Sequence, residues 1–574
     1  MDTVEIEIPT RKERKFIPEH FKITTWDTLK TYFDQLRDRE INSASELEEW
    51  LQDRSELEAV LEEDLAWRYI RSTCDTASKE LEDAYIFFIK NIEPNVAPYA
   101  NGFNEKLLNS PYKDELDQEK YFIYLRAVKK QKELYRDENI PLLTEAQTLS
   151  QKYNSITGDM TVNIDGKELT MQQASKLLEE QDRNVRENTF RKTTERRLQD
   201  AEKLDELFTQ LIAIRHKIGT NAGYDNYRDY KHEALGRFDY SVDDCMTFQE
   251  AIKAEIIPIA KAMNEHRKDA LGLDSLRPWD TEVDLTGRPP LKPFNGAVDL
   301  INRSIDCFDK VDPYFSECLA IMKEMKHIDL ESRKGKAPGG YNYPLAEIGV
   351  PFIFMNAANA HRDVVTMVHE GGHAVHSFLS KDLEITEFQN VPSEVAELAS
   401  MSMELISIEY WDVFYNDEEE LKRAKRDQLE KVFKMLPWIA VVDRFQHWIY
   451  TNNDHSVKER HEAWLEIFTD YFGNDIDWTG FEDAHRTRWH AQMHIFEIPF
   501  YYIEYAMAQL GAIAIWKNYK EDPQQALHNY KEGLKLGYTK TIGEIYKTAG
   551  IKFDFSGEYV RELAQFVKAE LDNV

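Results

Sequence analysis

The chain has 574 residues, of which 42% are hydrophobic and 12% aromatic, so it can bury a large core and is not an intrinsically disordered protein. Lysine and arginine number 72 against 104 aspartates and glutamates, which gives a formal net charge of −32. Charge of that sign repels phosphate backbones and anionic lipid, so we expect neither nucleic acid nor a membrane surface as a partner.

The N-terminal segment MDTVEIEIPTRKERKF lacks the apolar stretch of a secretory signal. No apolar run in the chain approaches the ~18 residues that a membrane span requires. The four cysteines are scattered and form no CxxC pair, so neither a disulfide framework nor a cysteine-bound metal is expected. These features predict a cytoplasmic protein with reduced thiols and leave its oligomeric state open.

Most of the chain has the residue spacing of helices. Residues 43–72 and 172–218 repeat apolar side chains every three or four positions among charges, which is typical of helices that pack one face on a core. Between them, MTVNIDGKELTM (160–171) has two short alternating runs around Asp165-Gly166 and predicts a β-hairpin with a type I′ turn. The proline- and glycine-rich residues 271–296 predict a long connection.

A second strand signal is GVPFIFMN (349–356), which follows a loop containing Gly339 and Gly340. As an edge strand it would bind a peptide by strand addition, although an internal strand fits the sequence equally well. The chain is thus predicted to be mainly α. We expect an N-terminal helical lobe over residues 1–175, with the hairpin near its end, and a larger helical lobe over 176–574 that holds a small β-sheet.

The pattern HExxH occurs within HRDVVTMVHEGGHAVHSFL (361–379). His369 and His373 are four residues apart, so on a helix their imidazoles project from one face, where one zinc ion can bind both. Glu370 follows the first histidine and is placed to act as general base on an attacking water.

Two further features of this segment favour a functional site. Gly371 and Gly372 each cost a helix roughly 1 kcal/mol relative to alanine, so we expect another group to approach the helix closely there. Asp363 lies six residues before His369, where its carboxylate can accept a ring N–H from that histidine and set its tautomer.

A catalytic zinc usually has three protein ligands. A third histidine in the metzincin pattern would need glycine at 376 and histidine at 379, where the chain has His376 and Leu379. We therefore expect a carboxylate from a following helix. Residues 390–405 predict such a helix, and its first carboxylates are Glu394 and Glu397. Either is a candidate, although the helix dipole alone explains Glu394 better than Glu397.

A third segment, HIFEIPFYYIEYAMAQLG, crowds a histidine and three tyrosines together. Its proline predicts the first turn of a helix, which leaves His494 on the preceding loop. Tyr501, Tyr502 and Tyr505 then fall at helical spacings of three and four. Imidazole N–H and phenol O–H groups are the donors that an oxyanion needs, but aromatic residues at this spacing also suit a hydrophobic core.

These motifs resemble the thimet oligopeptidase and oligoendopeptidase F family of zinc metallopeptidases, and the Pz-peptidase-like oligoendopeptidase F branch more closely. The resemblance rests on DVVTMVHEGGHAVHS (363–377), PSEVAE (392–397) and HIFEIPFYYIEYAMAQLG (494–511). It implies one zinc ion bound by His369, His373 and Glu397. It also implies two largely helical lobes around a deep substrate channel, with the zinc on the channel floor.

The resemblance implies roles for residues that do not bind the metal. Glu370 would be the general base. His494, together with Tyr502 or Tyr505, would stabilise the oxyanion, and Tyr501 would contact substrate. The choice among the tyrosines stays open, because the chain reads Tyr-Tyr-x-x-Tyr where the family has Tyr-Tyr-x-Tyr.

The predicted function is that of a zinc-dependent oligoendopeptidase, which hydrolyses internal bonds of short, unstructured peptides. The loop at Gly339 and Gly340 would close over the substrate. One alternative is a helical metallocarboxypeptidase, in which Arg486 or Arg488 binds the terminal carboxylate of the substrate. Another is a non-catalytic peptide-binding protein with a relict zinc site. Internal cleavage of a peptide blocked at both ends would favour the endopeptidase.

Overall fold

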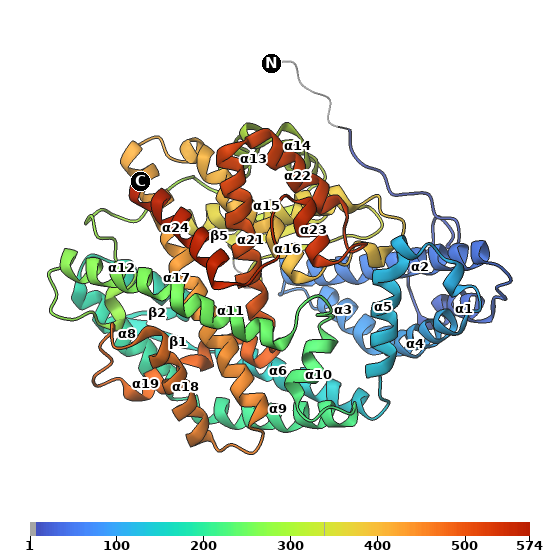
Figure 1. The fold of residues 1–574 in the computed structure, drawn as a ribbon, viewed down its shortest axis with the longest axis horizontal. Helices are drawn as coiled ribbons and strands as arrows, with labels where there is room; N and C mark the ends of the chain where they lie inside the picture. Colours follow the sequence, from blue (N-terminus) through green and yellow to red (C-terminus); the bar gives the residue numbers. More distant parts are fainter. Residues whose placement is uncertain (1–6, 334, 338) are drawn as a thin grey trace. The chain divides into compact units, whose positions relative to one another are not determined.

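The computed structural model describes residues 7–333, 335–337 and 339–574 and is mainly helical with two small sheets, as the sequence predicts (Figure 1). The chain forms two compact units, and each unit is built from three separate chain segments. The first unit contains residues 1–133, 292–424 and 508–553, and the second contains 134–291, 425–507 and 554–574. The boundary expected near residue 175 and the deep channel stay predictions.

The first unit holds most of the N-terminal helices and a three-stranded sheet. Its elements are α1 (Trp26–Asp38), α2 (Ala44–Cys74), α3 (Lys79–Asn91), α4 (Glu93–Asn109), α5 (Gln118–Leu134), α13 (Ala297–Val311), α14 (Pro313–Glu324), β3 (Ile328–Glu331), β4 (Tyr341–Tyr343), β5 (Phe352–Ala357), α15 (His361–Ser380), α16 (Ser393–Ser407), α22 (Pro523–Lys535) and α23 (Ile542–Thr548). Two long helices, α17 (Glu418–Thr451) and α21 (Tyr502–Glu521), have residues in both units.

The second unit contains the hairpin and the remaining helices. Its elements are α6 (Asn139–Gly158), β1 (Thr161–Ile164), β2 (Lys167–Thr170), α7 (Met171–Ser175), α8 (Arg183–Leu198), α9 (Ala201–Asn221), α10 (Tyr227–Ala234), α11 (Val242–Glu255), α12 (Ile257–Ala270), α18 (Val457–Phe472), α19 (Glu482–Arg486), α20 (Met493–Glu497) and α24 (Gly557–Asn573). The predicted hairpin is confirmed: β1 and β2 pair antiparallel, and Asp165 and Gly166 have φ of 53° and 79°, as a type I′ turn requires.

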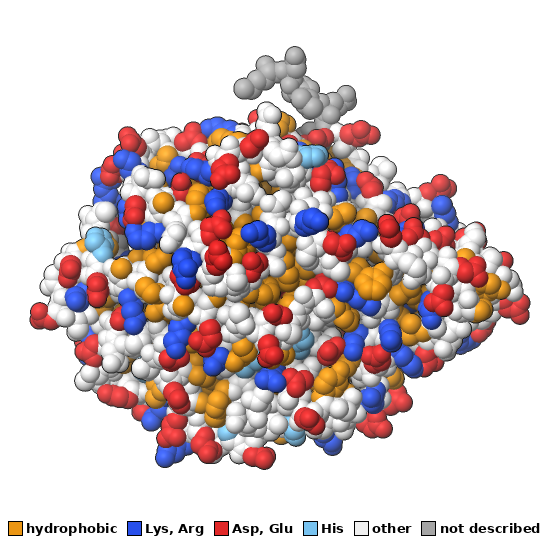
Figure 2. Space-filling view, viewed as in Figure 1, with side chains coloured by type: hydrophobic (Ala, Val, Ile, Leu, Met, Phe, Trp, Pro, Cys, Tyr) orange, Lys and Arg blue, Asp and Glu red, His pale blue; other side chains and the backbone are white. Residues whose placement is uncertain are grey.

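The surface mixes charges of both signs. On the face drawn in Figure 2, acidic and basic side chains are interspersed, with apolar side chains between them. No patch of a single sign dominates that face. Among the described helices, none combines the length and the hydrophobicity needed to cross a bilayer.

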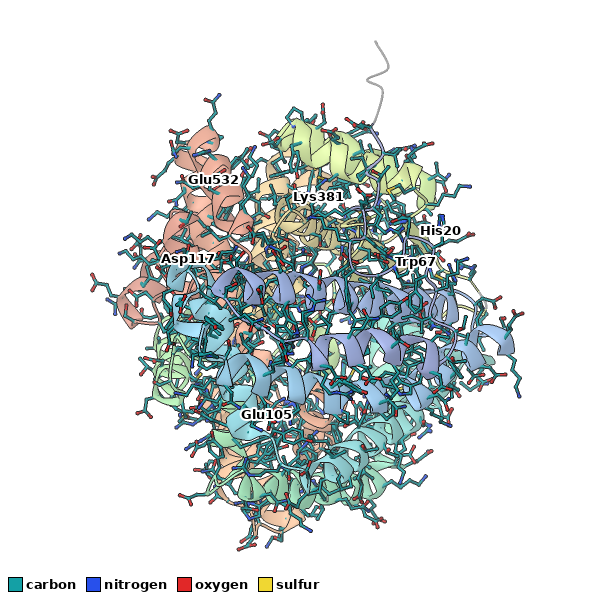
Figure 3. All side chains as sticks on the ribbon, turned by 90° about the vertical axis from the view of Figure 1, so that its right-hand side faces the viewer. His20, Trp67, Glu105, Asp117, Lys381 and Glu532 are labelled. Atoms are coloured by element: carbon teal, nitrogen blue, oxygen red, sulfur yellow. The ribbon has the colours of Figure 1, made fainter. Side chains whose placement is uncertain are left out.

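Helix α2 supports the three-stranded sheet. Its Ala66 and Ile70 are buried together with Phe352 and Phe354 of β5 in one apolar cluster. The indole of Trp67, labelled in Figure 3, packs edge-on against Phe352 with ring centroids 6.0 Å apart. The helix predicted over residues 43–72 thus gives the sheet a hydrophobic base.

The strand order of this sheet is β3-β5-β4, so β5 is its central strand. It pairs in parallel with β3 and antiparallel with β4. The expectation that residues 349–356 form an edge strand is therefore wrong. The physical reason is burial on both faces: Phe352 to Met355 are all buried, the pattern of an internal strand. Strand β4 is the edge beside α15, and the Asn342 side chain donates to the Glu370 carbonyl oxygen at 3.2 Å.

Helices α15 and α16 approach so closely that only glycine fits between them. A Cβ at Gly372 would lie 2.6 Å from the Ser400 Cα and 2.8 Å from the Ala399 carbonyl oxygen, both on the α16 backbone. A Cβ at Gly371 would lie 2.6 Å from the Phe308 ring of α13. The close approach expected at these glycines is confirmed.

Two tyrosines from late in the chain bond to the backbone of α16. The buried Tyr530 hydroxyl on α22 donates to the Ala399 carbonyl oxygen at 2.8 Å. The buried Tyr546 hydroxyl on α23 donates to the Glu394 carbonyl oxygen at 3.1 Å. Helix α16 is thus held between α15 and the C-terminal part of the first unit.

We predict that Gly372→Ala lowers the free energy of unfolding by about 1–3 kcal/mol, because the new methyl group meets backbone that cannot rotate away. Gly543→Ala is the matched control, since a Cβ at this position of α23 meets no atom within 4 Å. Thermal or urea unfolding of the two variants measures the difference. Equal stability of the two would contradict the close packing of α15 on α16.

Candidate metal centre

The three predicted metal ligands converge within the first unit. The His369 Nε2 and His373 Nε2 atoms lie 3.4 Å and 3.7 Å from the Glu397 Oε2 atom. The three ligand atoms all lie within 4.8 Å of one another. Ligands bound to zinc at ~2.1 Å in a tetrahedral arrangement are about 3.4 Å apart, so this donor set fits a zinc ion.

Helix geometry explains how these side chains meet. His369 and His373 lie one turn apart on α15, with ring centroids 4.9 Å apart. Glu397 comes from the second turn of α16, which packs against α15 at Gly372. Glu394, one turn earlier, does not belong to the metal-binding group found among the described residues. Of the two candidates for the third ligand, the geometry therefore favours Glu397.

A carboxylate that the sequence reasoning missed orients the first histidine. The His369 Nδ1 and Glu404 Oε1 atoms are 2.7 Å apart, so the ring N–H donates to the carboxylate and leaves Nε2 free to bind a metal. Glu404 is buried and lies seven residues after Glu397 on α16, two turns along the same face. A glutamate seven residues after Glu397, on the same face of the predicted helix, is the sequence feature from which this role could have been predicted.

Asp363 does not accept the ring N–H of His369, so the role predicted for it is wrong. Its Oδ2 accepts the backbone N–H groups of Ala358 and Ala360, at 2.7 Å and 2.9 Å. The carboxylate is used to cap the start of α15, where unpaired backbone donors and the helix dipole favour a negative group.

Crowded carboxylates set the proton affinities of this site. Burial raises the pKa of Glu370 to about 7. The negative charges of Glu397 and Glu404 add to the rise, and the positive charge of His369 opposes it. Burial would lower the pKa of His369, but its hydrogen bond to Glu404 and the neighbouring carboxylates raise it to about 9. Burial and the charge of His369 hold the pKa of His373 well below its usual value. A divalent cation would neutralise this concentration of negative charge.

A second group of metal-ligand type, in the second unit, does not fit a cation. The Asp205 Oδ1 atom lies 3.1 Å from His461 Nε2 and 3.2 Å from His490 Nε2. The Arg460 guanidinium donates to the same oxygen at 3.2 Å. Because a positive side chain already occupies this carboxylate, the group is a buried hydrogen-bond cluster.

The histidine and tyrosines of the third segment also lie together, in the second unit. The His494 ring centroid is 6.1, 4.8 and 6.0 Å from those of Tyr501, Tyr502 and Tyr505. His494 lies on the short helix α20, and α21 begins only at Tyr502. The expected loop for His494 and the helix start at the proline are therefore wrong. The reason is that residues 498–501 form a turn in which Phe500 has a φ of 69°.

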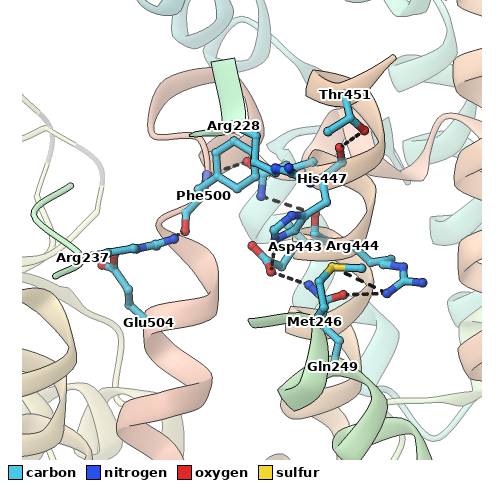
Figure 4. Close-up of polar contacts among 12 residues, drawn as sticks. Arg228, Arg237, Met246, Gln249, Asp443, Arg444, His447, Thr451, Phe500 and Glu504 are labelled. Atoms are coloured by element: carbon cyan, nitrogen blue, oxygen red, sulfur yellow. Dashed lines mark hydrogen bonds and ion pairs between the residues drawn. The ribbon is translucent and has the colours of Figure 1, made fainter. Parts of the chain in front are cut away.

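Buried polar contacts hold this strained turn (Figure 4). The Phe500 N–H donates to the Gln446 side chain at 2.8 Å, and the Phe500 carbonyl oxygen accepts from the Arg237 guanidinium. Arg237 also pairs with the buried Glu504 carboxylate at 2.7 Å, in the first turn of α21. A left-handed φ is costly for phenylalanine, and these bonds offset that cost.

A chain of hydrogen bonds defines the tautomer of His494. The Trp438 indole N–H can only donate, and it lies 3.0 Å from the Gln492 Oε1 atom. The Gln492 amide nitrogen must then face His494 Nδ1, at 2.8 Å, and it can only donate. Nδ1 is therefore an acceptor, and the ring proton sits on Nε2. Burial lowers the pKa of His494 to about 4, so the neutral ring is the relevant form.

The remaining predicted residues have structural surroundings of their own. Gly339 has a φ of 96°, and its carbonyl oxygen accepts from the Asn356 side chain at 2.9 Å. A Cβ at Gly340 would lie 3.2 Å from the Phe354 carbonyl oxygen, so this loop lies against β5. Arg486 forms an exposed ion pair with Asp483, whereas Arg488 lines a cavity of the second unit.

Comparison with known proteins identifies the family. The model of peptidase family M3 matches residues 176–565, and the model of the peptidase M3 N-terminal domain matches residues 16–152. The chain belongs to peptidase family M3. Its members are metallopeptidases, in agreement with the metal-binding group on α15 and α16.

Curated relatives and solved structures resemble this M3 peptidase over much of its length. It is 23% identical over 489 residues to an oligoendopeptidase F homolog from Borreliella burgdorferi, covering 81% of this chain and 80% of that one. It is 23% identical over 427 residues to the oligopeptidase PepF of Bacillus subtilis, covering 71% and 60%. The solved structure of Pz peptidase A with an inhibitor matches with a TM-score of 0.89 and 26% identity, over 98% of this chain and 99% of that one. The resemblance inferred from the motifs is confirmed.

We predict that Glu397→Ala lowers the zinc affinity of the M3 peptidase at least about tenfold more than Glu394→Ala does. Of these two glutamates, only Glu397 brings an oxygen to the two imidazoles. A loss of about tenfold is expected when one ligand or its support is removed. Both glutamates are buried on the same helix, so each variant controls for the structural cost of the other. Equilibrium dialysis against a zinc buffer measures both. Greater zinc loss from Glu394→Ala would reverse the assignment.

Proposed function

We propose that this M3 peptidase is a zinc-dependent oligoendopeptidase, which cuts internal bonds of short, unstructured peptides. The observation that carries the proposal is the convergence of His369, His373 and Glu397 with the buried Glu370 beside them. A zinc ion at these ligands supplies Lewis-acid chemistry, which polarises a carbonyl and makes water a nucleophile near neutral pH.

Glu370 is the general base of the proposed reaction. Its carboxylate takes a proton from the attacking water and passes it to the nitrogen of the leaving amine. Burial raises the pKa of Glu370 above its ordinary value, which makes the carboxylate a better proton acceptor than an exposed glutamate. The Asn342 bond to the Glu370 carbonyl oxygen ties this part of α15 to the edge strand β4.

For His494 we keep the oxyanion-binding role that the family resemblance implies. Its Nε2–H is the donor, because Gln492 occupies Nδ1. Tyr502 and Tyr505 remain joint candidates for the second donor, and Tyr501 for substrate contact; their rings all lie about the same imidazole.

The substrate side of the proposal rests on β4. Because β5 is internal, strand addition by an extended peptide would use β4, residues 341–343, the edge beside α15. Main-chain pairing of this kind accepts many side chains but needs an unfolded segment, which favours short peptides over folded proteins. Closure of the loop at Gly339 and Gly340, and action in the cytoplasm, are further parts of the proposal.

We predict that Glu370→Gln retains zinc but lowers kcat at least ~10²-fold, because the base is lost while the ligands remain. The assay uses a ten-residue peptide that is N-acetylated and C-amidated, with products identified by mass spectrometry. Internal fragments from the wild type support the endopeptidase, whereas no cleavage of the blocked peptide alongside cleavage of the free one would favour a carboxypeptidase. A Glu370→Gln rate within a fewfold of wild type would remove the assigned base.

The pH dependence of kcat/KM gives a second check on Glu370. The base must be ionised, so activity falls as the pH drops through the pKa of Glu370. That pKa is about 7 without a metal, and the positive charge of bound zinc lowers it further. We therefore expect the midpoint of the acid limb below pH 7. A midpoint well above 7 would contradict the assignment.

We predict that Gln492→Glu adds an alkaline limb to the pH profile of kcat. The new carboxylate accepts a proton from Nδ1, so neutral His494 presents a lone pair at Nε2 and only the imidazolium still donates there. Activity would then require the protonated ring and fall as the pH rises, by roughly tenfold or more if one oxyanion donor is lost. Gln525→Glu, on the exposed start of α22, is the control. Identical profiles for wild type and Gln492→Glu would contradict the tautomer assignment.

A further inference from the structure

A cavity of about 720 Å³ lies within the second unit. Its walls come from α12, α17, α18 and α24 and from loop residues near 281–285 and 473–478. Pockets for small molecules have volumes of roughly 300–1,000 Å³, so this one can hold a ligand of that class. None of the residues to which the proposed oligoendopeptidase reaction gives a role lines the cavity; Arg488, considered above only for the carboxypeptidase alternative, does.

The charge of the cavity wall is opposite to that of the chain. Seven of the lining side chains are lysine or arginine and four are aspartate or glutamate. The whole chain has a net charge of −32. A local excess of positive charge in so acidic a protein favours an anionic ligand.

Arg488 is the cationic group that the wall holds in one place. Its guanidinium carbon lies 4.9 Å from the ring centroid of Trp438, 5.4 Å from that of Phe468 and 5.5 Å from that of Trp478. Three aromatic neighbours restrict the position of the guanidinium, although Arg488 keeps its contact with solvent.

The donors of Arg488 are not used by the protein itself. Within residues 7–333, 335–337 and 339–574, Arg488 takes part in no hydrogen bond or ion pair. The wall carboxylate of Glu430 is shared between Arg267 at 3.8 Å and Lys434 at 3.5 Å. A guanidinium held in place with its N–H groups free can pair with an anion that accepts from them.

We propose that this cavity binds an amphipathic carboxylate. The planar carboxylate pairs with the Arg488 fork, the geometry that guanidinium groups favour, and the apolar body packs against half-buried side chains such as Met263, Phe472 and Ile476. Two sources share this chemistry: a medium-chain fatty acid, and the C-terminal residue of a peptide that ends in a bulky apolar side chain. The proposal does not rest on the proposed peptidase reaction, although Trp438 of the cavity wall also donates to Gln492, the neighbour of His494.

The test measures binding by isothermal titration calorimetry and by tryptophan fluorescence, since Trp438 and Trp478 flank Arg488. Decanoate is compared with decylamine, which has the same chain and the opposite charge. Acetyl-Ala-Ala-Leu is compared with its C-terminal amide, in Glu370→Gln protein so that nothing is cleaved. Arg488→Gln removes the proposed anchor. Arg486→Gln is the matched control, because this neighbouring arginine lies outside the cavity.

We expect at least one of the two carboxylates to bind, and Arg488→Gln to weaken it by about tenfold or more while Arg486→Gln leaves it unchanged. Binding of decanoate alone assigns a fatty acid, binding of the peptide acid but not its amide assigns a peptide C-terminus, and binding of both leaves the carboxylate as the recognised group. The proposal is overturned if neither carboxylate binds at about 1 mM, or if both arginine variants bind equally well.

Met435→Glu keeps the experiment decisive if Arg488→Gln does not fold. Met435 lines the cavity on α17 and is partly exposed, so a glutamate there tolerates solvent and leaves Arg488 in place. The added negative charge should weaken carboxylate binding and strengthen decylamine binding. Unchanged binding of both probes to a folded Met435→Glu variant would also overturn the proposal.

Discussion

The contact between α15 and α16 at Gly372 is the constraint on which the candidate metal centre depends. The two imidazoles come from α15 and the carboxylate from α16, so the separation of two helix axes sets the ligand distances. Metal–ligand distances tolerate deviations of only about 0.2 Å. A separation fixed by backbone against backbone meets this tolerance better than one set by flexible side chains. The costly pair of glycines inside a helix is thus explained by the chemistry that the helix supports.

The second constraint is electrostatic. Glu370, Glu397 and Glu404 are buried close together, which is unfavourable unless positive charge accompanies them. Without a metal, the raised proton affinities of Glu370 and His369 partly relieve the repulsion. A metal ion and protons therefore compete for the same buried histidine and glutamate side chains. A bound cation would neutralise their negative charge more fully than protons do.

The sequence allowed the main elements of this centre to be predicted because the relevant signals are local. The spacing of His369 and His373 defines a helix face, whereas the residues alone left Glu394 and Glu397 as alternatives and the family resemblance singled out Glu397. The roles of Glu404 and Gln492 were not predicted, because each role depends on a contact with one particular histidine. A single sequence does not show which side chains lie within hydrogen-bond distance of each other. Asp363 was wrongly assigned for a related reason: the free N–H groups of a helix start compete for a carboxylate, and here they win.

The strand order shows the same limit. The apolar run 352–355 predicts a strand, but the run alone does not identify the neighbouring strands. The structure places this strand inside the sheet, where it is buried on both faces. Likewise, a proline marks a turn without saying where the next helix begins. Residues 498–501 show this, because the backbone of Phe500 is in the left-handed region and α21 begins only at Tyr502.

The interleaving of chain segments has a consequence for biosynthesis. Helix α16 takes hydrogen bonds from Tyr530 and Tyr546, so the first unit is complete only when residue 553 has left the ribosome. A nascent chain that already contains both histidines and Glu397 still lacks the helices that fix α16. The chain up to residue 553 must therefore be made before the candidate metal-binding groups are held in place, and no contiguous fragment that ends earlier contains the whole first unit. Premature hydrolysis by an unfinished chain is thereby disfavoured by topology alone.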